Sequence, residues 1–472
     1  MQFDSPIFFL AFLPFAIALI FAAPRRYSNV AIIILSLVFY TWGEPRFALV
    51  VVASAAFDWI VARTMHRIPE DRGRRSRKLL LLATIGENVG LLVFYKYLAF
   101  AVGNLDRVLS LAGGKTFAVP SIALPIGVSF VVFEKITYVV DLYRGVALPA
   151  NSFLDYLAYV LLFPKLLAGP IVKYHEIADQ LKVRPKNLED IREGATRFCY
   201  GMGKKVLIAD LSGDIANAVF LVPVARLGFQ EAWLGALAFS VQIYFDFSAY
   251  SDMAIGIARV LGFRLRENFN YPYTAQNITE FWRRWHISLS SWIREYIYIP
   301  LGGSRAGKGR TYLNLTVAFL LCGIWHGAAW TFVVWGIFQG LFLVMDRAFW
   351  LEKQMGLPVI ARQLGTFLIV TVSWVIFRSP DISHAVGYLG VMASVLKHGT
   401  FLYLRNDQIA AMILGYILIA IPFAKRYQDW ADRFVGMQWA PDSSLCASMA
   451  VLVLAIGRVS AASFSPFLYF RF

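Results

Sequence analysis

The sequence predicts an all-α polytopic membrane protein that forms a single multi-spanning domain over residues 1–472. Three observations lead to this prediction. Hydrophobic residues make up 58% of the chain and the mean hydropathy is +0.58, which leaves too little polar surface to cover a soluble globule. Apolar stretches long enough for membrane spans recur along the chain, and the basic residues gather in short clusters between them.

Thirteen apolar stretches are candidate spans, because a span needs roughly 20 apolar residues. In chain order they cover residues 7–23, 29–43, 46–62, 79–103, 120–140, 153–172, 194–221, 231–262, 311–345, 363–378, 385–396, 408–424 and 444–462. Several are too short to cross alone, so we expect re-entrant or tilted segments with backbone buried in protein or lining a cavity. The first stretch lacks a preceding basic region, which favours a transmembrane helix over a cleaved signal peptide.

The net charge of +15 comes from basic residues that gather between the candidate spans. Basic clusters lie at residues 25–26, 72–78, 283–284 and 308–310, and no recognisable nucleic-acid-binding motif accompanies them. Cytoplasmic loops of membrane proteins carry such an excess of Lys and Arg. We therefore expect stretches 65–78 and 264–310 to be cytoplasmic and the amino terminus to face outward.

The three cysteines, Cys199, Cys322 and Cys446, lie in or beside apolar segments. They lack the paired spacing of a disulfide framework or a zinc site. We expect all three to be buried as small hydrophobic residues, with no metal site.

An unusual stretch, residues 281–294, interleaves Trp and Phe with Arg. One interpretation is an interfacial helix whose Trp and Arg side chains lie at the level of the lipid headgroups. The other is a cytoplasmic cap that binds an anionic donor. In that case Arg283, Arg284 and Arg294 would contact phosphates through their guanidinium groups, with Trp285 beside them.

His326 is the histidine that lies within a long apolar run, residues 312–345. An imidazole there needs a partner or a wet cavity, and the small residues Gly323, Gly327, Ala328 and Ala329 permit close helix packing or a helix break. His326 is either a hydrogen-bonded structural residue or a catalytic base. Transfer of an acyl group to a hydroxyl needs a base, donors for an oxyanion and exclusion of water.

Four further polar residues, Asp246, Ser248, Tyr250 and Asp252, lie in an apolar segment. They could line the same cavity as His326, or form hydrogen bonds between helices. A transporter is the main alternative in another class, since buried polar residues also describe transporters. Transporters often consist of two similar halves, and no such internal symmetry is visible here.

Several motifs together resemble the membrane-bound O-acyltransferase family, in particular its bacterial branch of alginate O-acetylation. Trp285 and His286 lie within the 281–292 stretch, and Trp325, His326 and Gly327 follow later in the chain. Further matching segments are residues 124–130, 138–145, 163–171, 244–262, 298–303 and 470–472. The chain departs from the pattern by its polar residues at 87–88 and 134–135.

The resemblance implies a ring of transmembrane and re-entrant helices around a thin central tunnel. It implies that His326 is the buried catalytic histidine and that His286, nearer the cytoplasmic cap, orients the donor or lines the tunnel mouth beside Trp325. The implied donor is acetyl-CoA, with no bound cofactor. The implied partners are an extracytoplasmic acetyltransferase and an alginate-like exopolysaccharide at the bacterial inner membrane. Peptidoglycan as acceptor, or transfer of D-alanine to an envelope polymer, remain alternatives.

Overall fold

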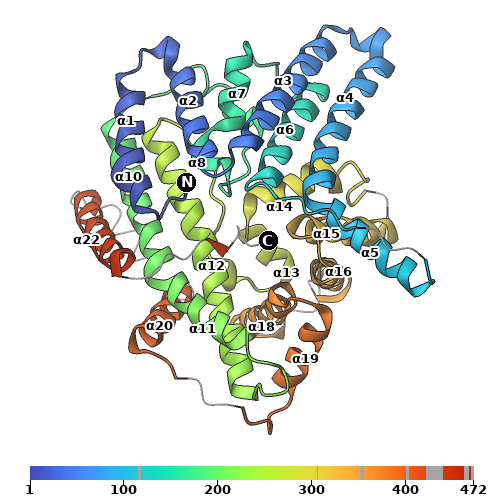
Figure 1. Cartoon of the computed structure of the whole chain (residues 1–472), viewed down its shortest axis with the longest axis vertical. Helices are drawn as coiled ribbons and strands as arrows, with labels where there is room; N and C mark the ends of the chain where they lie inside the picture. Colours follow the sequence, from blue (N-terminus) through green and yellow to red (C-terminus); the bar gives the residue numbers. More distant parts are fainter. Residues whose placement is uncertain are drawn as a thin grey trace. The chain divides into compact units, whose positions relative to one another are not determined.

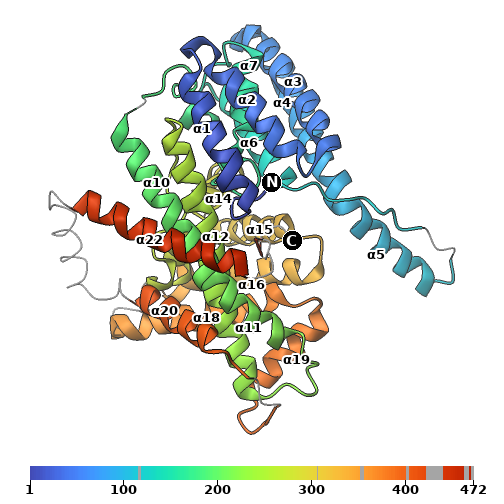
Figure 2. The ribbon, with the colours of Figure 1, turned by 60° about the vertical axis from the view of Figure 1, so that its left-hand side comes forward.

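The structure, a computed structural model, describes residues 1–114, 118–185, 187–305, 307–350, 356–399, 403–420, 440–461 and 467–468. Within these ranges the regular elements are helices and no strand is present, which confirms the predicted all-α class (Figures 1 and 2). The final motif, residues 470–472, lies outside the described residues.

Five described helical segments are long and apolar enough to cross a membrane. The first is α3 (Pro45–Arg67), and the second is Gly73–Leu111, which covers most of α4 (Glu70–Leu92) and all of α5 (Leu98–Leu111). The third is Trp330–Phe349, which begins with α16 (Trp330–Met345). The last two are α18 (Val359–Arg378) and Asp442–Ala461, which is most of α22 (Ala440–Ala461). Shorter apolar helices include Phe8–Ala22, α19 (Ile382–Ala393) and α20 (Asn406–Ala420). The protein is therefore a multi-pass membrane protein.

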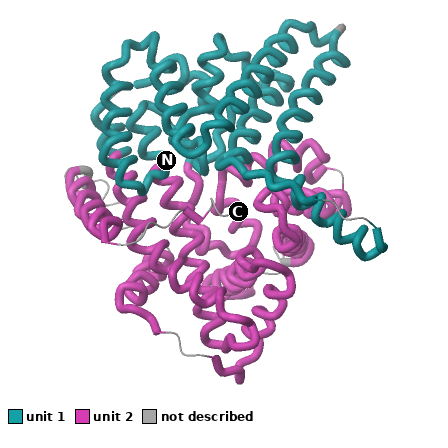
Figure 3. Tube along the Cα trace, viewed as in Figure 1, with its two compact units in different colours: residues 1–194, 254–266 teal, residues 195–253, 267–472 magenta. Residues whose placement is uncertain are grey.

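The chain forms two compact units (Figure 3). Unit 1 comprises residues 1–194 and 254–266, and unit 2 comprises residues 195–253 and 267–472. Unit 1 contains α1 (Leu13–Ala22), α2 (Ser28–Thr41), α3, α4, α5, α6 (Val128–Tyr143), α7 (Phe153–Leu161), α8 (Phe163–Leu166) and α9 (Tyr174–Ile177). Unit 2 contains α11 (Asp210–Phe220), α13 (Ile278–Arg284), α14 (Ile287–Ile293), α15 (Lys308–His326), α16, α18, α19, α20 and α22. Helices α10 (Leu188–Gly203) and α12 (Phe229–Val260) contribute residues to both.

Unit 1 has an ionic cluster, buried except at Glu87, that includes three of the four polar residues that depart from the family pattern. The Lys135 ammonium lies 3.3 Å from Asp58 and 3.5 Å from Glu87, and the Asn88 amide donates to Asp58. A charged group inside a helical membrane domain is stable only when it is paired. These residues therefore join α3, α4 and α6 to one another.

The apolar run at 311–345 is two helices rather than one span. Helix α15 ends at His326, Gly327 is extended, and α16 begins at Trp330. The two helices pack closely: a Cβ on Gly323 would lie 2.3 Å from the Phe332 carbonyl oxygen. The small residues thus both break the helix and allow close packing, and the histidine is placed at the break.

The predicted burial of all three cysteines is wrong for Cys446. Cys199 and Cys322 are buried, whereas Cys446 is exposed on α22. Apolar composition alone does not distinguish a helix face that packs on protein from one that faces away from it.

The 281–294 stretch is not one interfacial helix. Helices α13 and α14 divide it at Trp285 and His286, and Phe281, Trp282, Trp285 and Trp292 are buried. These aromatic side chains pack inside unit 2 and are not presented to lipid as the apolar face of an interfacial helix would be.

Candidate active site

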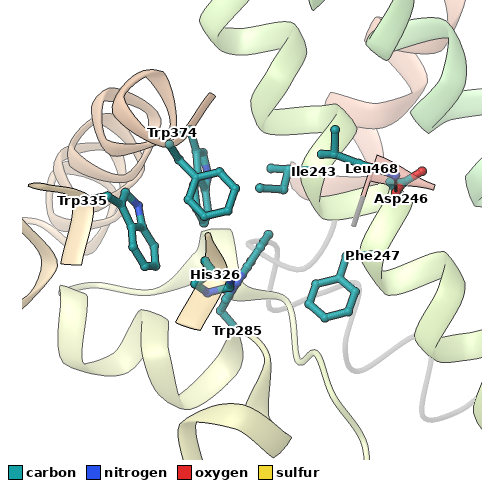
Figure 4. A pocket seen from close by; sticks show the side chains of 9 residues that line it. Ile243, Asp246, Phe247, Trp285, His326, Trp335, Trp374 and Leu468 are labelled. Carbon is teal, nitrogen blue, oxygen red and sulfur yellow. Dashed lines mark hydrogen bonds between the residues drawn. The ribbon is translucent and has the colours of Figure 1, made fainter. Parts of the chain in front are cut away.

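A small cavity in unit 2 contains His326. Its volume is about 20 Å³, and it is lined by Ile243, Asp246, Phe247, Trp285, His326, Trp335, Trp374, Phe377 and Leu468 (Figure 4). Most of this lining is aromatic or aliphatic, and the two side chains that can ionise are Asp246 and His326. The cavity is therefore an apolar chamber with one imidazole and one carboxylate.

Aromatic rings hold the His326 imidazole. Its centroid lies 4.9 Å from the Trp325 ring centroid, 5.2 Å from that of Trp335 and 5.3 Å from that of Phe377, with interplanar angles of 70°, 89° and 78°. These rings come from α15, α16 and α18, so the end of α15 is packed between its two neighbours. The imidazole is buried. Packing on three sides restricts its rotation and keeps bulk water away.

His286 is also buried and adopts an unusual backbone conformation. Its φ of 43° and ψ of 55° lie in the left-handed region, directly before α14. This conformation is uncommon for a residue other than glycine and costs free energy that the surroundings must offset. Strained residues of this kind are concentrated at functional sites.

Asn268 fixes the orientation of the His286 ring. Its Oδ1 lies 3.1 Å from His286 Nδ1 and also accepts hydrogen bonds from the backbone N–H and the hydroxyl of Ser288. Its amide nitrogen donates to the Ser251 hydroxyl. Because Oδ1 can only accept, His286 Nδ1 carries a proton and Nε2 is the basic nitrogen of the neutral ring.

The two histidines belong to one site. Burial, together with the nearby His326, lowers the pKa of His286 well below its ordinary value. With its pKa lowered, His286 stays neutral at physiological pH. The Trp325 ring lies next to both imidazoles, with centroid distances of 4.9 Å to His326 and 6.3 Å to His286.

Asp246 connects the cavity to a buried ion pair. Its carboxylate lies 2.7 Å from the Lys205 ammonium, which also lies 2.8 Å from Asp210. The backbone N–H of Leu468 donates to Asp246 at 2.8 Å, and the Phe467 ring lies beneath Lys205. Leu468 is a wall of the cavity, so this network holds the last described residues of the chain against the site.

Of the four predicted tunnel-lining residues on α12, Asp246 alone is part of the cavity lining. The Ser248 hydroxyl donates to the Phe245 carbonyl of its own helix, and Asp252 pairs with Arg197 and Lys204. Tyr250 is buried against Phe467. Ser248 and Asp252 follow Asp246 by two and six positions, which turns them about 200° and 240° around the helix from Asp246, whereas Tyr250, four positions on, shares its face. A tunnel-lining role for these three side chains stays a prediction.

The predicted donor-binding residues are divided between the surface and the cavity. Trp285 lines the cavity, whereas Arg283 and Arg294 are exposed. Arg284 forms an ion pair with Glu280 at 2.8 Å, one helical turn away. Of the three arginines, Arg283 and Arg294 therefore retain the more accessible guanidinium groups.

Sequence reasoning missed Asn268, Trp335, Trp374 and Phe377. Trp374 and Phe377 are three residues apart on α18, a spacing that places two large aromatic residues on one helix face. That spacing was a usable signal. Asn268 lies in a polar stretch, and nothing in its local sequence indicates that it contacts a histidine.

Chemically, the site offers imidazole bases in an apolar chamber. No group of three or more His, Cys, Asp or Glu residues in the described ranges could hold a metal ion. A neutral imidazole can take a proton from a hydroxyl, and low polarity strengthens hydrogen bonds to charge that develops during a reaction.

Comparisons with known proteins agree with this chemistry. The model of the MBOAT, membrane-bound O-acyltransferase family, matches residues 146–372. A probable alginate O-acetylase of Pseudomonas putida is 38% identical over 491 residues, with 100% of both chains covered. A peptidoglycan O-acetyltransferase of Helicobacter pylori is 33% identical, covering 100% of this chain and 97% of the relative. A teichoic acid D-alanyltransferase of Bacillus subtilis is 26% identical, covering 55% of this chain and 70% of the relative.

Proposed function

The chain belongs to the membrane-bound O-acyltransferase family and is an O-acyltransferase, and from this premise we propose that it transfers acetyl groups through the membrane. The donor is a cytoplasmic acetyl thioester, acetyl-CoA in the first instance. The acetyl group passes through an intramembrane tunnel to an extracytoplasmic hydroxyl. The placement of His326 in an aromatic, water-poor cavity is the observation that carries this proposal.

His326 acts as the general base. It removes the proton of the acceptor hydroxyl as the oxygen attacks the thioester carbonyl. His286, oriented by Asn268, is an accessory residue that positions the acetyl group or the attacking hydroxyl near Trp325.

The donor binds through cations at its phosphate groups. Arg283 and Arg294 are exposed and suited to phosphate by guanidinium geometry. Trp285, two residues after Arg283, lines the cavity, so a donor held at the arginines would have its thioester within reach of the site. Arg284 supports α13 through its pairing with Glu280.

The acceptor is an exopolysaccharide of the alginate type at the inner membrane, reached through an extracytoplasmic acetyltransferase. This choice follows the relatives named for alginate O-acetylation, which cover the whole chain. The Helicobacter relative is named for peptidoglycan, so peptidoglycan is the second candidate. Supplying each polymer to the same reconstituted system distinguishes the two by which polymer gains labelled acetyl ester.

The central test replaces His326 by Gln in protein reconstituted with radiolabelled acetyl-CoA and acceptor. General-base assistance is worth roughly 100- to 10,000-fold, so His326→Gln should lower the rate of acetyl transfer by about that factor. Gln preserves much of the side-chain size, whereas His326→Ala also leaves a cavity, and comparing the two separates chemistry from packing. A folded, inserted His326→Gln protein with wild-type turnover would refute the proposed mechanism.

A further inference from the structure

Trp335 contributes a buried hydrogen-bond donor to the wall of the cavity. The side chain is fully buried, and its indole Nε1 has no hydrogen-bond partner among the described residues. Leaving a buried donor unsatisfied costs about 1–3 kcal/mol, so most buried polar groups are paired. An acceptor supplied by a molecule inside the cavity would satisfy this N–H during the reaction.

The position of Trp335 suits such a role. Its ring lies 5.2 Å from the His326 ring at an angle of 89°, and Figure 4 shows Trp335, Trp374 and His326 together on one side of the cavity. The neighbouring Trp374 differs in the property that matters here. Its Nε1 already donates to the Tyr273 hydroxyl at 3.2 Å, so its N–H is engaged outside the cavity.

Acyl transfer creates an oxygen that needs a donor. The hydroxyl oxygen of the acceptor bonds to the carbonyl carbon while its proton passes to His326, and the π electron pair moves onto the carbonyl oxygen. When that pair returns, the C–S bond breaks, and the sulfur leaves with the bonding electrons and takes the proton from His326. One thioester and one alcohol thus become one ester and one thiol, and between the two steps the former carbonyl oxygen is negatively charged.

We propose that the Trp335 indole N–H donates to this oxyanion. The assignment rests on the proposed function, since it requires that the thioester carbonyl enter the cavity beside His326. The cavity walls are mostly apolar, and in such surroundings a fixed donor stabilises developing charge more than it does in water. Trp335 is a catalytic residue in this scheme because its N–H contacts a reacting atom.

The test removes the N–H while keeping the ring system. In reconstituted enzyme, benzothienylalanine in place of Trp335 keeps a bicyclic aromatic side chain without the donor, and Trp335→Phe removes donor and part of the ring. Loss of one hydrogen-bond donor to an oxyanion typically costs about 100- to 1,000-fold in kcat. The kcat of both variants should therefore fall by that factor, with little change in KM for the acetyl donor. Trp374→Phe makes the same reduction in ring size at an engaged N–H, and we expect a smaller loss of kcat.

Two results would overturn the proposal. If the benzothienylalanine variant, with a wild-type melting temperature, keeps wild-type kcat, Trp335 is a packing residue. The same holds if Trp335→Phe and Trp374→Phe lower kcat equally. His326→Gln measured alongside separates this inference from the proposed function: an inactive His326→Gln with a fully active Trp335 variant rejects the oxyanion role alone, whereas an active His326→Gln rejects both.

Discussion

At the scale of single residues, the orientation of His286 depends on the side-chain amide of Asn268. Asn268 accepts from its Nδ1 and from two donors of Ser288, so the same oxygen sets the tautomer of the histidine and the start of α14. A left-handed histidine without this amide would lose both its orientation and part of what offsets the backbone strain.

Replacing Asn268 by Asp should make the reaction sensitive to acid. A carboxylate beside an imidazole favours the protonated form, so the pKa of His286, which burial and the nearby His326 lower in the native protein, should rise. Below the raised pKa His286 becomes charged, and activity that requires the neutral ring is lost. The pH dependence of kcat/KM should therefore show an acid limb at higher pH than in the wild type.

Ser251→Ala is the matched control for this experiment. It removes the hydrogen bond from the Asn268 amide nitrogen and adds no charge. We expect a lower rate with the acid limb unmoved. Superimposable pH profiles for Asn268→Asp and the wild type would show that protonation of His286 does not limit the reaction.

The sequence identified the residues that are chemically conspicuous in an apolar setting. A polar group in an apolar run is costly to bury and therefore marks a pair or a functional site. His326 and Asp246 are two such groups, and both line the cavity. Trp335 escaped prediction because an indole in a membrane helix is unremarkable until its unpaired N–H is seen. Asn268 was not predicted because only the folded chain brings it into contact with His286.

At the scale of elements, the α15–α16 pair places His326. Gly323 lets the two helices approach until a Cβ at that position would meet the Phe332 carbonyl oxygen at 2.3 Å and Gly336 Cα at 2.9 Å. Both contacts are with backbone, which cannot rotate away as a side chain can. The distance between the two helices is therefore set by the absence of a side chain at Gly323.

Gly323→Ala should separate these helices and lower both stability and activity. Overpacking of this kind costs roughly 1–3 kcal/mol, which we expect as a lower melting temperature in detergent together with reduced acetyl transfer. Gly309→Ala, in the same helix, is the control, because a Cβ there meets nothing within 4 Å. It should leave melting unchanged or raise it slightly, since Ala favours helix. Equal melting of the two variants would contradict the close-packing argument.

Helix boundaries were predicted less well than helix existence. Residues 311–345 are apolar throughout their length, so hydropathy alone could not place a break, although the small residues made one possible. The break depends on how α15, α16 and α18 pack around the histidine, which is tertiary information. Burial of Phe281, Trp282 and Trp285 has the same origin.

At the scale of the whole molecule, composition determined the class because lipid imposes its own requirements on the chain. The ionic cluster of unit 1 shows the limit of that reasoning. Glu87, Asn88 and Lys135 stood out as polar, but their convergence with Asp58 across three helices is a property of the fold.

The predicted orientation can be tested by cysteine labelling. Arg75→Cys and Ser304→Cys place single exposed thiols in the two stretches expected in the cytoplasm. The background should carry Cys446→Ser, because Cys446 is exposed while Cys199 and Cys322 are buried. An impermeant maleimide should label both positions after permeabilisation and neither in intact spheroplasts. Labelling of either thiol in intact spheroplasts would reverse the assignment of that stretch.

The small volume of the cavity bears on how much acetyl donor is lost to hydrolysis by water. A water molecule needs roughly 10–15 Å³ of such space, and the cavity offers about 20 Å³. An acetyl group in place leaves little room for water to compete with the acceptor hydroxyl, so futile hydrolysis should be rare. Phe377→Ala would enlarge the chamber beside His326, and we expect more free acetate released per ester formed. A partition ratio between acetate and ester that matches the wild type would show that hydrolysis is prevented elsewhere, by the timing of donor and acceptor arrival.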